Sequence, residues 1–271
     1  MTSKLYCSIV SLFFVFASCN TNNKEIKQVT PVSNLIESLK NDINQYPDSL
    51  MLVQNLIESY RNEGYYDSAI ALTDKQIKKD SGNAYLWNIK ATLYFENEDT
   101  ANAIKSLEQA IAIYPLPEYL VALGTIYAEI KNKNALMIAD ELLQSNKTKS
   151  GKDAWFIKGL YYNYINESKK AIPYLDSCLL VNYTYMYAYR EKAIALYNLA
   201  KYNDALNVLK RAVTIQNNFD EGYFWMGKCY EKLNQKEDAI ESYQNALLYD
   251  KDFTEARDAL NRIRNKELNN Q

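Results

Sequence analysis

The stretch "AYLWNIKATLYFENEDTANAIKSLEQAIAIYPLP", residues 84–117, carries apolar and small residues at helical spacing in two successive segments. These positions are Trp87, Ala91, Tyr94, Ala103, Leu107 and Ala110. Residues three or four apart lie on the same face of an α-helix. A short polar turn separates the two segments, and Pro115 follows the second. The stretch therefore predicts two helices, each with one apolar face, packed against each other.

The same pattern recurs along most of the chain. An alanine followed four residues later by a larger, mostly apolar residue occurs at Ala69, Ala103, Ala135, Ala171, Ala205 and Ala239. The intervals between these alanines are 34, 32, 36, 34 and 34 residues. A fixed period of this length indicates stacked helix pairs that share a continuous core. The predicted units are 50–83, 84–117, 118–151, 152–185, 186–219 and 220–253.

The repeated pattern resembles the tetratricopeptide repeat, which runs Trp-x-x-Leu-Gly-x-x-Tyr, then Ala-x-x-x-Phe, then Pro. The unit at 152–185 carries Trp155, Gly159, Tyr162 and Ala171 at these positions. The resemblance implies an all-α fold: a right-handed superhelical solenoid of about six helix pairs. Lysine replaces the leucine of the pattern at Lys90, Lys158 and Lys192. We expect their aliphatic stems to lie on apolar surface and their amines to point into water.

The third unit and both ends of the array depart from the regular pattern. Gly124 comes one residue early, and the stretch "QSNKTKSGK", residues 144–152, is predicted to be a polar loop. Residues 32–49 are predicted to form an N-terminal helix equivalent to the second helix of a degenerate repeat. Residues 254–271 are predicted to form a C-terminal capping helix, because one side is apolar and the remainder is charged.

The amino terminus has the pattern of a secretory signal, predicted over residues 1–18. Lys4 precedes an apolar run from Leu5 to Ala17, which is too short to span a bilayer comfortably. The following "FASC" resembles the lipobox of bacterial lipoproteins, with Phe16 where the common pattern has Leu. This resemblance implies acylation of Cys19. Residues 19–31 are polar and aperiodic, and they are predicted to form a tether.

Composition argues against catalysis and against nucleic-acid binding. The chain has no histidine, which excludes Ser-His-Asp and Cys-His constellations and any metal site containing histidine. The formal charge is −2, which does not favour nucleic acid. We therefore expect a non-enzyme without a cofactor or bound metal. Cys178 and Cys229 lie on different repeats and are expected to be buried free thiols.

Positions on the first helix of each unit predict a partner groove. Residues one, five, eight and nine after the Trp position fall on a second face of that helix, away from the packing face. In tetratricopeptide arrays this face lines the concave groove in which partner peptides bind. The predicted groove residues are Tyr85, Asn88, Phe95, Phe156, Leu160, Asn163, Tyr164, Tyr187, Arg190, Ile194, Tyr197, Asn198, Phe224 and Lys228, with Lys232 following. Aromatic rings with Asn and Arg suit an extended peptide.

These patterns predict a non-catalytic scaffold or adaptor that is lipid-anchored on the extracytoplasmic side of a bacterial envelope. In a bacterium with two membranes, the outer membrane is the expected location. The expected partner is a protein segment or helix bound in the groove. Small-ligand or glycan capture is the alternative, because rings and amides also suit sugars. Self-association is left open. Gln54 and Glu58 stand where chaperone-binding repeats use Lys and Asn, so a two-carboxylate clamp is not expected.

Overall fold

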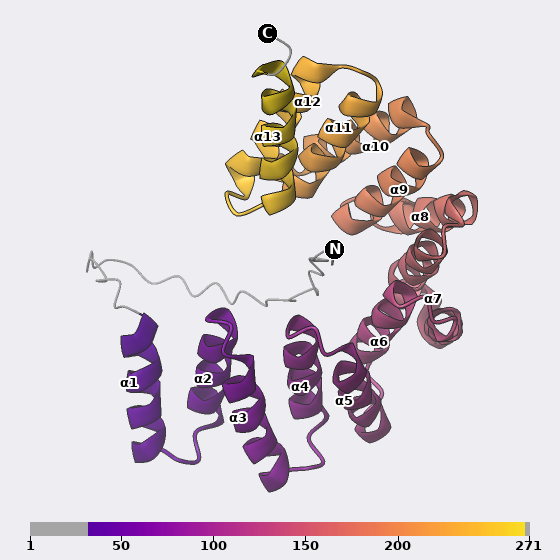
Figure 1. Cartoon of the computed structure of the whole chain (residues 1–271). Coiled ribbons are helices and arrows are strands. Elements are labelled where there is room, and N and C mark those ends of the chain that lie inside the picture. Colours follow the sequence, from indigo (N-terminus) through magenta and orange to yellow (C-terminus); the bar gives the residue numbers. More distant parts are fainter. Residues whose placement is uncertain (1–31, 269–271) are drawn as a thin grey trace, which may run out of the picture. The chain divides into compact units, whose positions relative to one another are not determined.

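A computed structural model describes the backbone of residues 32–268 and the side chains of residues 34–144 and 151–265. The predicted signal, the acylated Cys19 and the tether lie outside the described residues. Helices account for all the regular structure between residues 32 and 268 (Figure 1). They are α1 (Val32–Gln45), α2 (Leu50–Asn62), α3 (Tyr66–Lys79), α4 (Ala84–Glu96), α5 (Thr100–Ile113), α6 (Pro117–Glu129), α7 (Asn134–Tyr164), α8 (Ser168–Val181), α9 (Met186–Asn198), α10 (Tyr202–Ile215), α11 (Asp220–Lys232), α12 (Lys236–Tyr249) and α13 (Thr254–Leu268).

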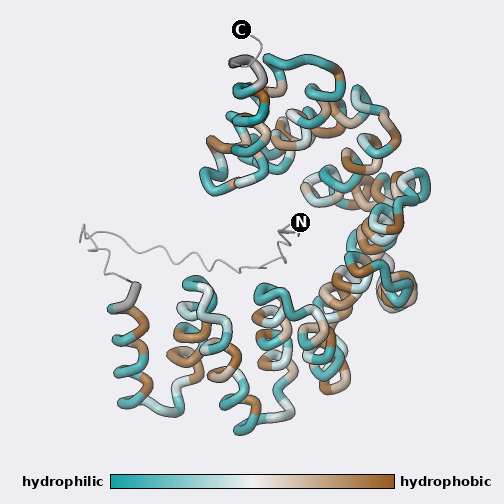
Figure 2. Tube along the Cα trace, viewed as in Figure 1, coloured by the Kyte–Doolittle hydropathy of each residue, from teal (hydrophilic) through white to brown (hydrophobic). Residues whose placement is uncertain are grey.

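Consecutive helix pairs make up the fold, which confirms the predicted all-α class. Helices α9, α11 and α13 begin at Met186, Asp220 and Thr254, so their starts are separated by the predicted 34 residues. Figure 2 shows hydrophobic and hydrophilic residues alternating along the helices. The alanines that define the period are all fully buried: Ala69, Ala103, Ala135, Ala171, Ala205 and Ala239. A small residue at these positions lets the paired helices approach closely.

Residues cluster into two compact units that divide between Ala122 and Leu123, within α6. In the first unit, α2, α3 and α4 surround an apolar cluster that contains Val53, Ile57 and Leu93. In the second unit, α9, α10 and α11 enclose a cluster around Leu206 and Leu209.

The turn between the helices of a pair has one recurring geometry. Its central residue has a left-handed backbone conformation, with φ between 57° and 73°. These residues are Gly64, Glu98, Lys131, Asn166, Ala200 and Asn234. The next amide bonds to a carbonyl five residues back, as in Lys201 N to Leu196 O at 2.9 Å. This hydrogen bond satisfies a carbonyl at the helix end, as in the Schellman motif. Only one of the six turns uses glycine.

The predicted polar loop at 144–152 is wrong. These residues are helical and lie within α7, which spans 31 residues. Asp140 and Lys158 of α7 form an ion pair at 2.5 Å, although a straight helix would separate them by about 27 Å, so the two ends of α7 fold back on each other. The stretch contains no proline, and its one glycine, Gly151, packs close to the ring of Trp155. Lys, Gln and Ser are all compatible with a helix interior. Within residues 32–268 no helix, α7 included, combines the length and the apolar character needed to cross a membrane.

The lysines at the leucine position do not simply point into water. Lys90 and Lys192 each pair with an aspartate of the preceding helix, and Lys158 pairs with Asp140 of α7 itself. The N···O distances are 2.7 Å to Asp74, 2.5 Å to Asp140 and 2.5 Å to Asp176. The prediction that these lysine amines point into water is therefore wrong, because each amine forms an ion pair with an aspartate of the adjoining helical segment. One repeat further on, between α10 and α11, the positions equivalent to Asp176 and Lys192 are occupied by Lys210 and Met226, so this ion pair is not repeated there.

Candidate partner-binding site

Three of the predicted groove residues on α7 are buried. Phe156, Leu160 and Asn163 are only 6%, 2% and 6% exposed, so the prediction that they offer accessible surface is wrong. Helix α7 contacts α9, the next first helix of the array, and this contact covers the face that was assigned to the groove. The Phe156 ring meets the Tyr185 ring edge-on at 5.1 Å between centroids.

Asn163 and Arg190 instead belong to a polar network that joins α7, α9 and α11. Asn163 Nδ2 donates to the backbone oxygen of Glu191 at 2.9 Å and to its Oε2 at 3.2 Å. Arg190 donates from Nε to Glu191 Oε1 at 3.1 Å and from Nη1 to Glu221 Oε1 at 2.6 Å. Burial alone would lower the Arg190 pKa, but the two carboxylates outweigh burial and raise it above its usual range. The network fixes how successive first helices lie against one another.

Tyr187, Ile194 and Tyr164 are half-buried in the second unit, and Asn198 is exposed at the end of α9. The Arg190 guanidinium lies over the Tyr187 ring, 5.3 Å from its centroid.

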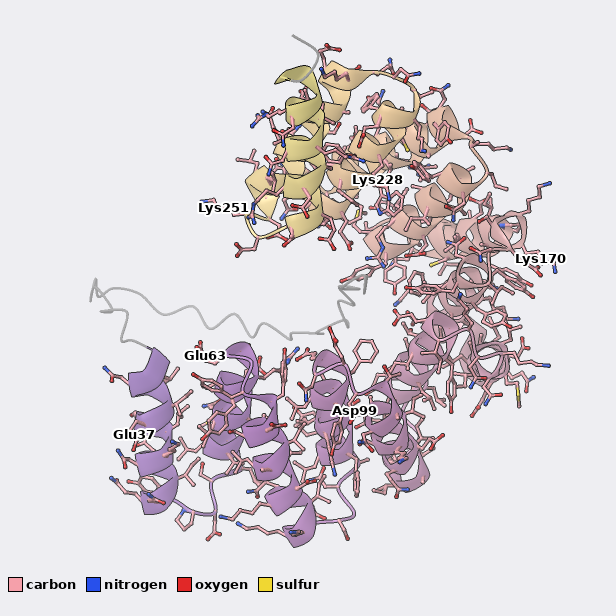
Figure 3. All side chains as sticks on the ribbon, in the orientation of Figure 1. Glu37, Glu63, Asp99, Lys170, Lys228 and Lys251 are labelled. Atoms are coloured by element: carbon pink, nitrogen blue, oxygen red, sulfur yellow. The ribbon has the colours of Figure 1, made fainter. Side chains whose placement is uncertain are left out.

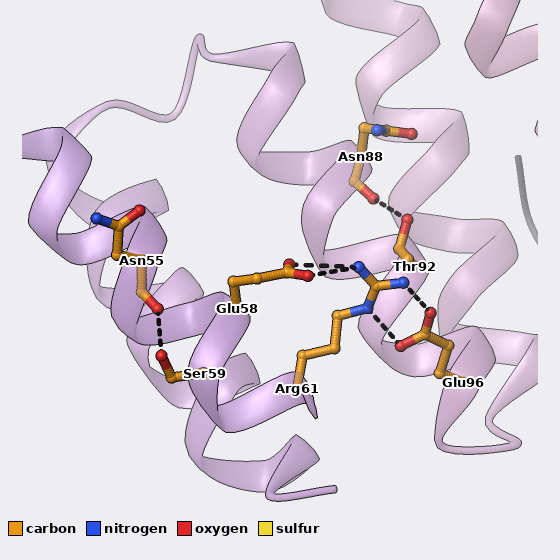
Figure 4. A network of polar contacts seen from close by, with 7 residues as sticks. All are labelled: Asn55, Glu58, Ser59, Arg61, Asn88, Thr92 and Glu96. Atoms are coloured by element: carbon orange, nitrogen blue, oxygen red, sulfur yellow. Dashed lines mark hydrogen bonds and ion pairs between the residues drawn. The ribbon is translucent and has the colours of Figure 1, made fainter. Parts of the chain in front are cut away.

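The earlier predicted residues belong to the other compact unit. Tyr85 is exposed, Phe95 is half-buried, and the backbone oxygen of Asn88 accepts from Thr92 Oγ1 at 3.2 Å. Nearby, Arg61 bridges α2 and α4 through both oxygens of Glu96 and also pairs with Glu58 at 3.3 Å (Figure 4). Glu58 is therefore occupied by an ion pair with a residue of its own helix.

An open hollow of about 550 Å³ lies on the second unit, and we call it the C-terminal hollow. It is lined by Tyr197, Phe224, Lys228, Glu231, Lys232, Tyr243, Glu255, Asp258, Ala259 and Arg262. Tyr197 comes from α9 and Tyr243 from α12, while the others come from α11 and α13. The structure therefore brings the predicted Tyr197, Phe224, Lys228 and Lys232 together.

The lining residues on α12 and α13 were missed by the sequence prediction. Those on α13 carried a signal, because Asp258 and Arg262 stand 34 residues after Phe224 and Lys228. Extending the groove positions by one more period would have found them.

Three aromatic rings lie close to the amine of Lys228. Figure 3 labels this lysine among the side chains of the second unit. Its Nζ lies 4.0 Å from the ring centroid of Trp225, 5.4 Å from that of Tyr197 and 5.6 Å from that of Phe224. An ammonium over an aromatic face is attracted by the ring quadrupole. Removal from water nevertheless lowers the Lys228 pKa. The amine is thus held in place, and within the described residues it has no carboxylate ion pair.

Glu231 links the walls of the hollow. Its Oε1 accepts from the hydroxyl of Tyr243 at 2.6 Å and from Arg262 Nη2 at 2.6 Å. The Tyr243 ring is fully buried against α11 at Gly227. Burial first, and then the Glu231 carboxylate, raise the pKa of this hydroxyl. The hydroxyl therefore stays protonated and remains a donor at neutral pH.

Two matches to family models place this geometry among known repeats. Residues 84–115 and residues 196–263 each match a model described as tetratricopeptide repeat. The chain contains tetratricopeptide repeats. The second match covers α10 to α12, most of α13 and the end of α9, and it includes every residue that lines the C-terminal hollow.

Related proteins carry the same repeats. Two tetratricopeptide-repeat proteins of Methanocaldococcus jannaschii are 29% and 22% identical over 47% and 78% of this chain. The chain spans 37% and 38% of their lengths, respectively.

Solved structures share the fold. A tetratricopeptide repeat protein from Parabacteroides merdae superposes with a TM-score of 0.72 at 18% identity, over 86% of this chain and 92% of that chain. A thermophilic tetratricopeptide-repeat protein of Thermus thermophilus gives 0.59 at 15% identity, over 67% of this chain and 98% of that one. A chain of the APC/C hetero-tetramer also gives 0.59, at 17% identity, over 85% of this chain and 46% of that chain.

Proposed function

We propose that this protein is a non-catalytic adaptor that binds a segment or helix of a protein partner in the C-terminal hollow. The observation that carries the proposal is the hollow itself, which combines half-buried rings with charged groups that have no ion pair among the described residues. Aromatic residues with a few placed polar groups form the energetic centre of many protein interfaces. Tetratricopeptide-repeat proteins generally act as interaction scaffolds, and a structurally similar chain comes from a hetero-tetramer.

We also propose that the protein is held at a bacterial envelope membrane, on the extracytoplasmic side, by acylation of Cys19. The support is the apolar run followed by "FASC" in the sequence. Metabolic labelling with a palmitate analogue tests this anchor. Label in the wild type and its loss in Cys19→Ala are expected, whereas equal labelling of both proteins would refute the anchor.

Photocrosslinking in cells tests the adaptor proposal. Benzoylphenylalanine at Lys232, an exposed position in the hollow, should yield a discrete protein adduct. The same probe at Leu180, which is 88% exposed and outside the hollow, is the matched control. Tyr197→Ala with Phe224→Ala should abolish the adduct while the circular dichroism spectrum is retained. The same adduct from both positions, or none from Lys232, would contradict the proposal.

Small-ligand or glycan capture is a second candidate, favoured by the size of the hollow. A volume of about 550 Å³ lies in the range of small-molecule sites. Calorimetry of the protein against envelope glycans separates the two candidates. Saturable heat that disappears in Phe224→Ala, without any crosslinked protein, would favour capture of a glycan over the adaptor.

A further inference from the structure

The charged groups of the C-terminal hollow fall into two classes, those already paired and those left unpaired. Glu231 and Arg262 form an ion pair at 2.6 Å. Lys228, Lys232 and Asp258 have no ion pair with any described residue. The hollow therefore holds two cations that lack a carboxylate and at least one carboxylate that lacks a cation.

Glu255 adds a second uncompensated carboxylate on the α13 side. Its Oε2 is shielded from solvent and has no hydrogen-bond partner in the part of the chain that the structure describes. Asp258 follows three residues later, so both carboxylates lie on one face of α13. A shielded acceptor without a donor is costly, because its lost hydration is not replaced. A partner that supplied a donor here would remove that cost.

The unpaired charges are separated along the helix direction. Helices α11 and α13 run the same way, because short turns reverse the chain on either side of α12. The Glu231–Arg262 pair sets these two residues at one level. At a rise of 1.5 Å per residue, Lys228 then lies about 4.5 Å before that level and Lys232 about 1.5 Å beyond it. Glu255 lies about 10.5 Å before the level and Asp258 about 6 Å before it.

Averaged over each pair, the two lysines lie about 7 Å further along the helices than the two carboxylates, so the hollow has an acidic end and a basic end, although Lys228 and Asp258 are nearly level. The rings of Phe224 and Tyr197 provide apolar surface beside them on the α11 and α9 side. An extended peptide advances about 3.3 Å per residue, so this separation corresponds to two or three residues. Neither a purely acidic nor a purely basic segment would compensate both ends.

We propose that the C-terminal hollow binds a protein segment carrying a basic and an acidic side chain two to three residues apart. The acidic side chain contacts Lys228 and Lys232, and the basic one contacts Glu255 and Asp258. The order of the two charges then fixes the direction in which the segment lies. This inference rests on the proposed adaptor function and specifies the chemistry of its partner.

Fluorescence polarisation with four labelled peptides tests this inference on the full chain carrying Cys19→Ala. All four are nine residues long, contain one Phe and have blocked ends. One carries Lys and Glu three residues apart, one has two Lys, one has two Glu, and one is neutral. The mixed peptide should bind about tenfold more tightly than any other, which is the effect of one additional ion pair of about 1.4 kcal/mol.

Substitutions assign each charge to its end of the hollow. Lys228→Met should weaken the mixed and acidic peptides about tenfold and leave the basic peptide unchanged, with the opposite pattern for Glu255→Gln. If Lys228→Met fails to fold, Lys232→Gln replaces it, because Lys232 is exposed and belongs to the same basic end of the hollow. Lys210→Met, an exposed lysine of α10 outside the hollow, should change nothing.

Two results would overturn the inference: equal binding of the mixed and single-charge peptides, or no binding of the mixed peptide below millimolar concentration. If the crosslinked adduct at Lys232 persists in Lys228→Met and Glu255→Gln at wild-type yield, the mixed-charge inference fails and the adaptor function stands. If that adduct never forms, the adaptor function fails as well.

Discussion

Gly227 of α11 lies directly against the ring of Tyr243. A Cβ built at this residue would lie 2.6–2.8 Å from three ring carbons of Tyr243. The ring is fully buried, and its hydroxyl is held by Glu231. It cannot move aside without losing that hydrogen bond. Gly227 is therefore required by close approach, although glycine in a helix interior is usually unfavourable.

Gly227→Ala should lower the free energy of unfolding by about 1 kcal/mol. The alanine gains about 1 kcal/mol in helix propensity, but overpacking costs about 1–3 kcal/mol. Urea denaturation followed by circular dichroism measures the difference. Gly82→Ala is the control, because the nearest atom to its new Cβ is 3.7 Å away. A Gly227→Ala protein more stable than the wild type would show that the ring yields easily.

Cys178 and Cys229 should be unreactive while the protein is folded. Burial raises the pKa of each thiol from 9.0 to about 12, so folding favours the protonated form. Their contribution to stability is complete below about pH 9 and is lost as pH rises toward 12. Alkylation with iodoacetamide at pH 8, mapped by peptide mass spectrometry, should label both residues only in denaturant. Rapid labelling of either thiol in the folded protein would contradict the burial.

At the scale of the helices, paired charges set how neighbouring elements meet. The Arg190 network joins three first helices in the second unit, and Arg61 joins two in the first. The Arg190 and Glu191 side chains are 17% and 6% exposed, whereas those of Arg61 and Glu58 are 24% and 47% exposed. The two networks are alike in chemistry and differ in their access to water.

Arg190→Met should therefore destabilise the protein more than Arg61→Met. Removing Arg190 leaves the Glu191 carboxylate buried without its cation, which costs about 3 kcal/mol in comparable buried pairs. Arg61→Met leaves more hydrated carboxylates, and about 1 kcal/mol is expected. Thermal unfolding of both variants at equal ionic strength gives the comparison. The same loss in both would mean that burial does not control the cost.

The sequence predicted the features that depend on contacts within one helix pair, and it failed for those that depend on how successive pairs pack. The helix pairs were predictable, because the 34-residue period and the fully buried alanines are local features of each pair. The burial of Phe156, Leu160 and Asn163 was not predictable, because it depends on the angle between successive pairs. Tyr197, Phe224 and Lys228 were found because their positions in the period coincide with the hollow.

At the scale of the whole molecule, contacts run mainly between neighbouring elements. In the second unit α7 contacts α8 and α9, and α11 contacts α9, α10 and α12. Repeat proteins of this kind have a stability close to the sum of unit terms and nearest-neighbour terms. A local defect should therefore spread only to the adjacent pairs.

Hydrogen exchange measured by mass spectrometry can follow that spread in Gly227→Ala. We expect faster amide exchange in α11 and α12 and, to a smaller degree, in α10 and α13. Amides of α2, α3 and α4 should exchange as in the wild type. Faster exchange throughout the chain would show that the array unfolds as one cooperative block.

The six left-handed turns show how this chain could be made more heat-resistant. A left-handed conformation costs an ordinary residue about 1–2 kcal/mol and costs glycine almost nothing. Ala200 is exposed, so Ala200→Gly should raise the melting temperature in scanning calorimetry, while Ala205→Gly, at a fully buried helical site, should lower it. The same exchange at Glu98 and Lys131 would add to the gain. Replacing a few exposed turn residues by glycine would thus raise the melting temperature without altering the packing between helices.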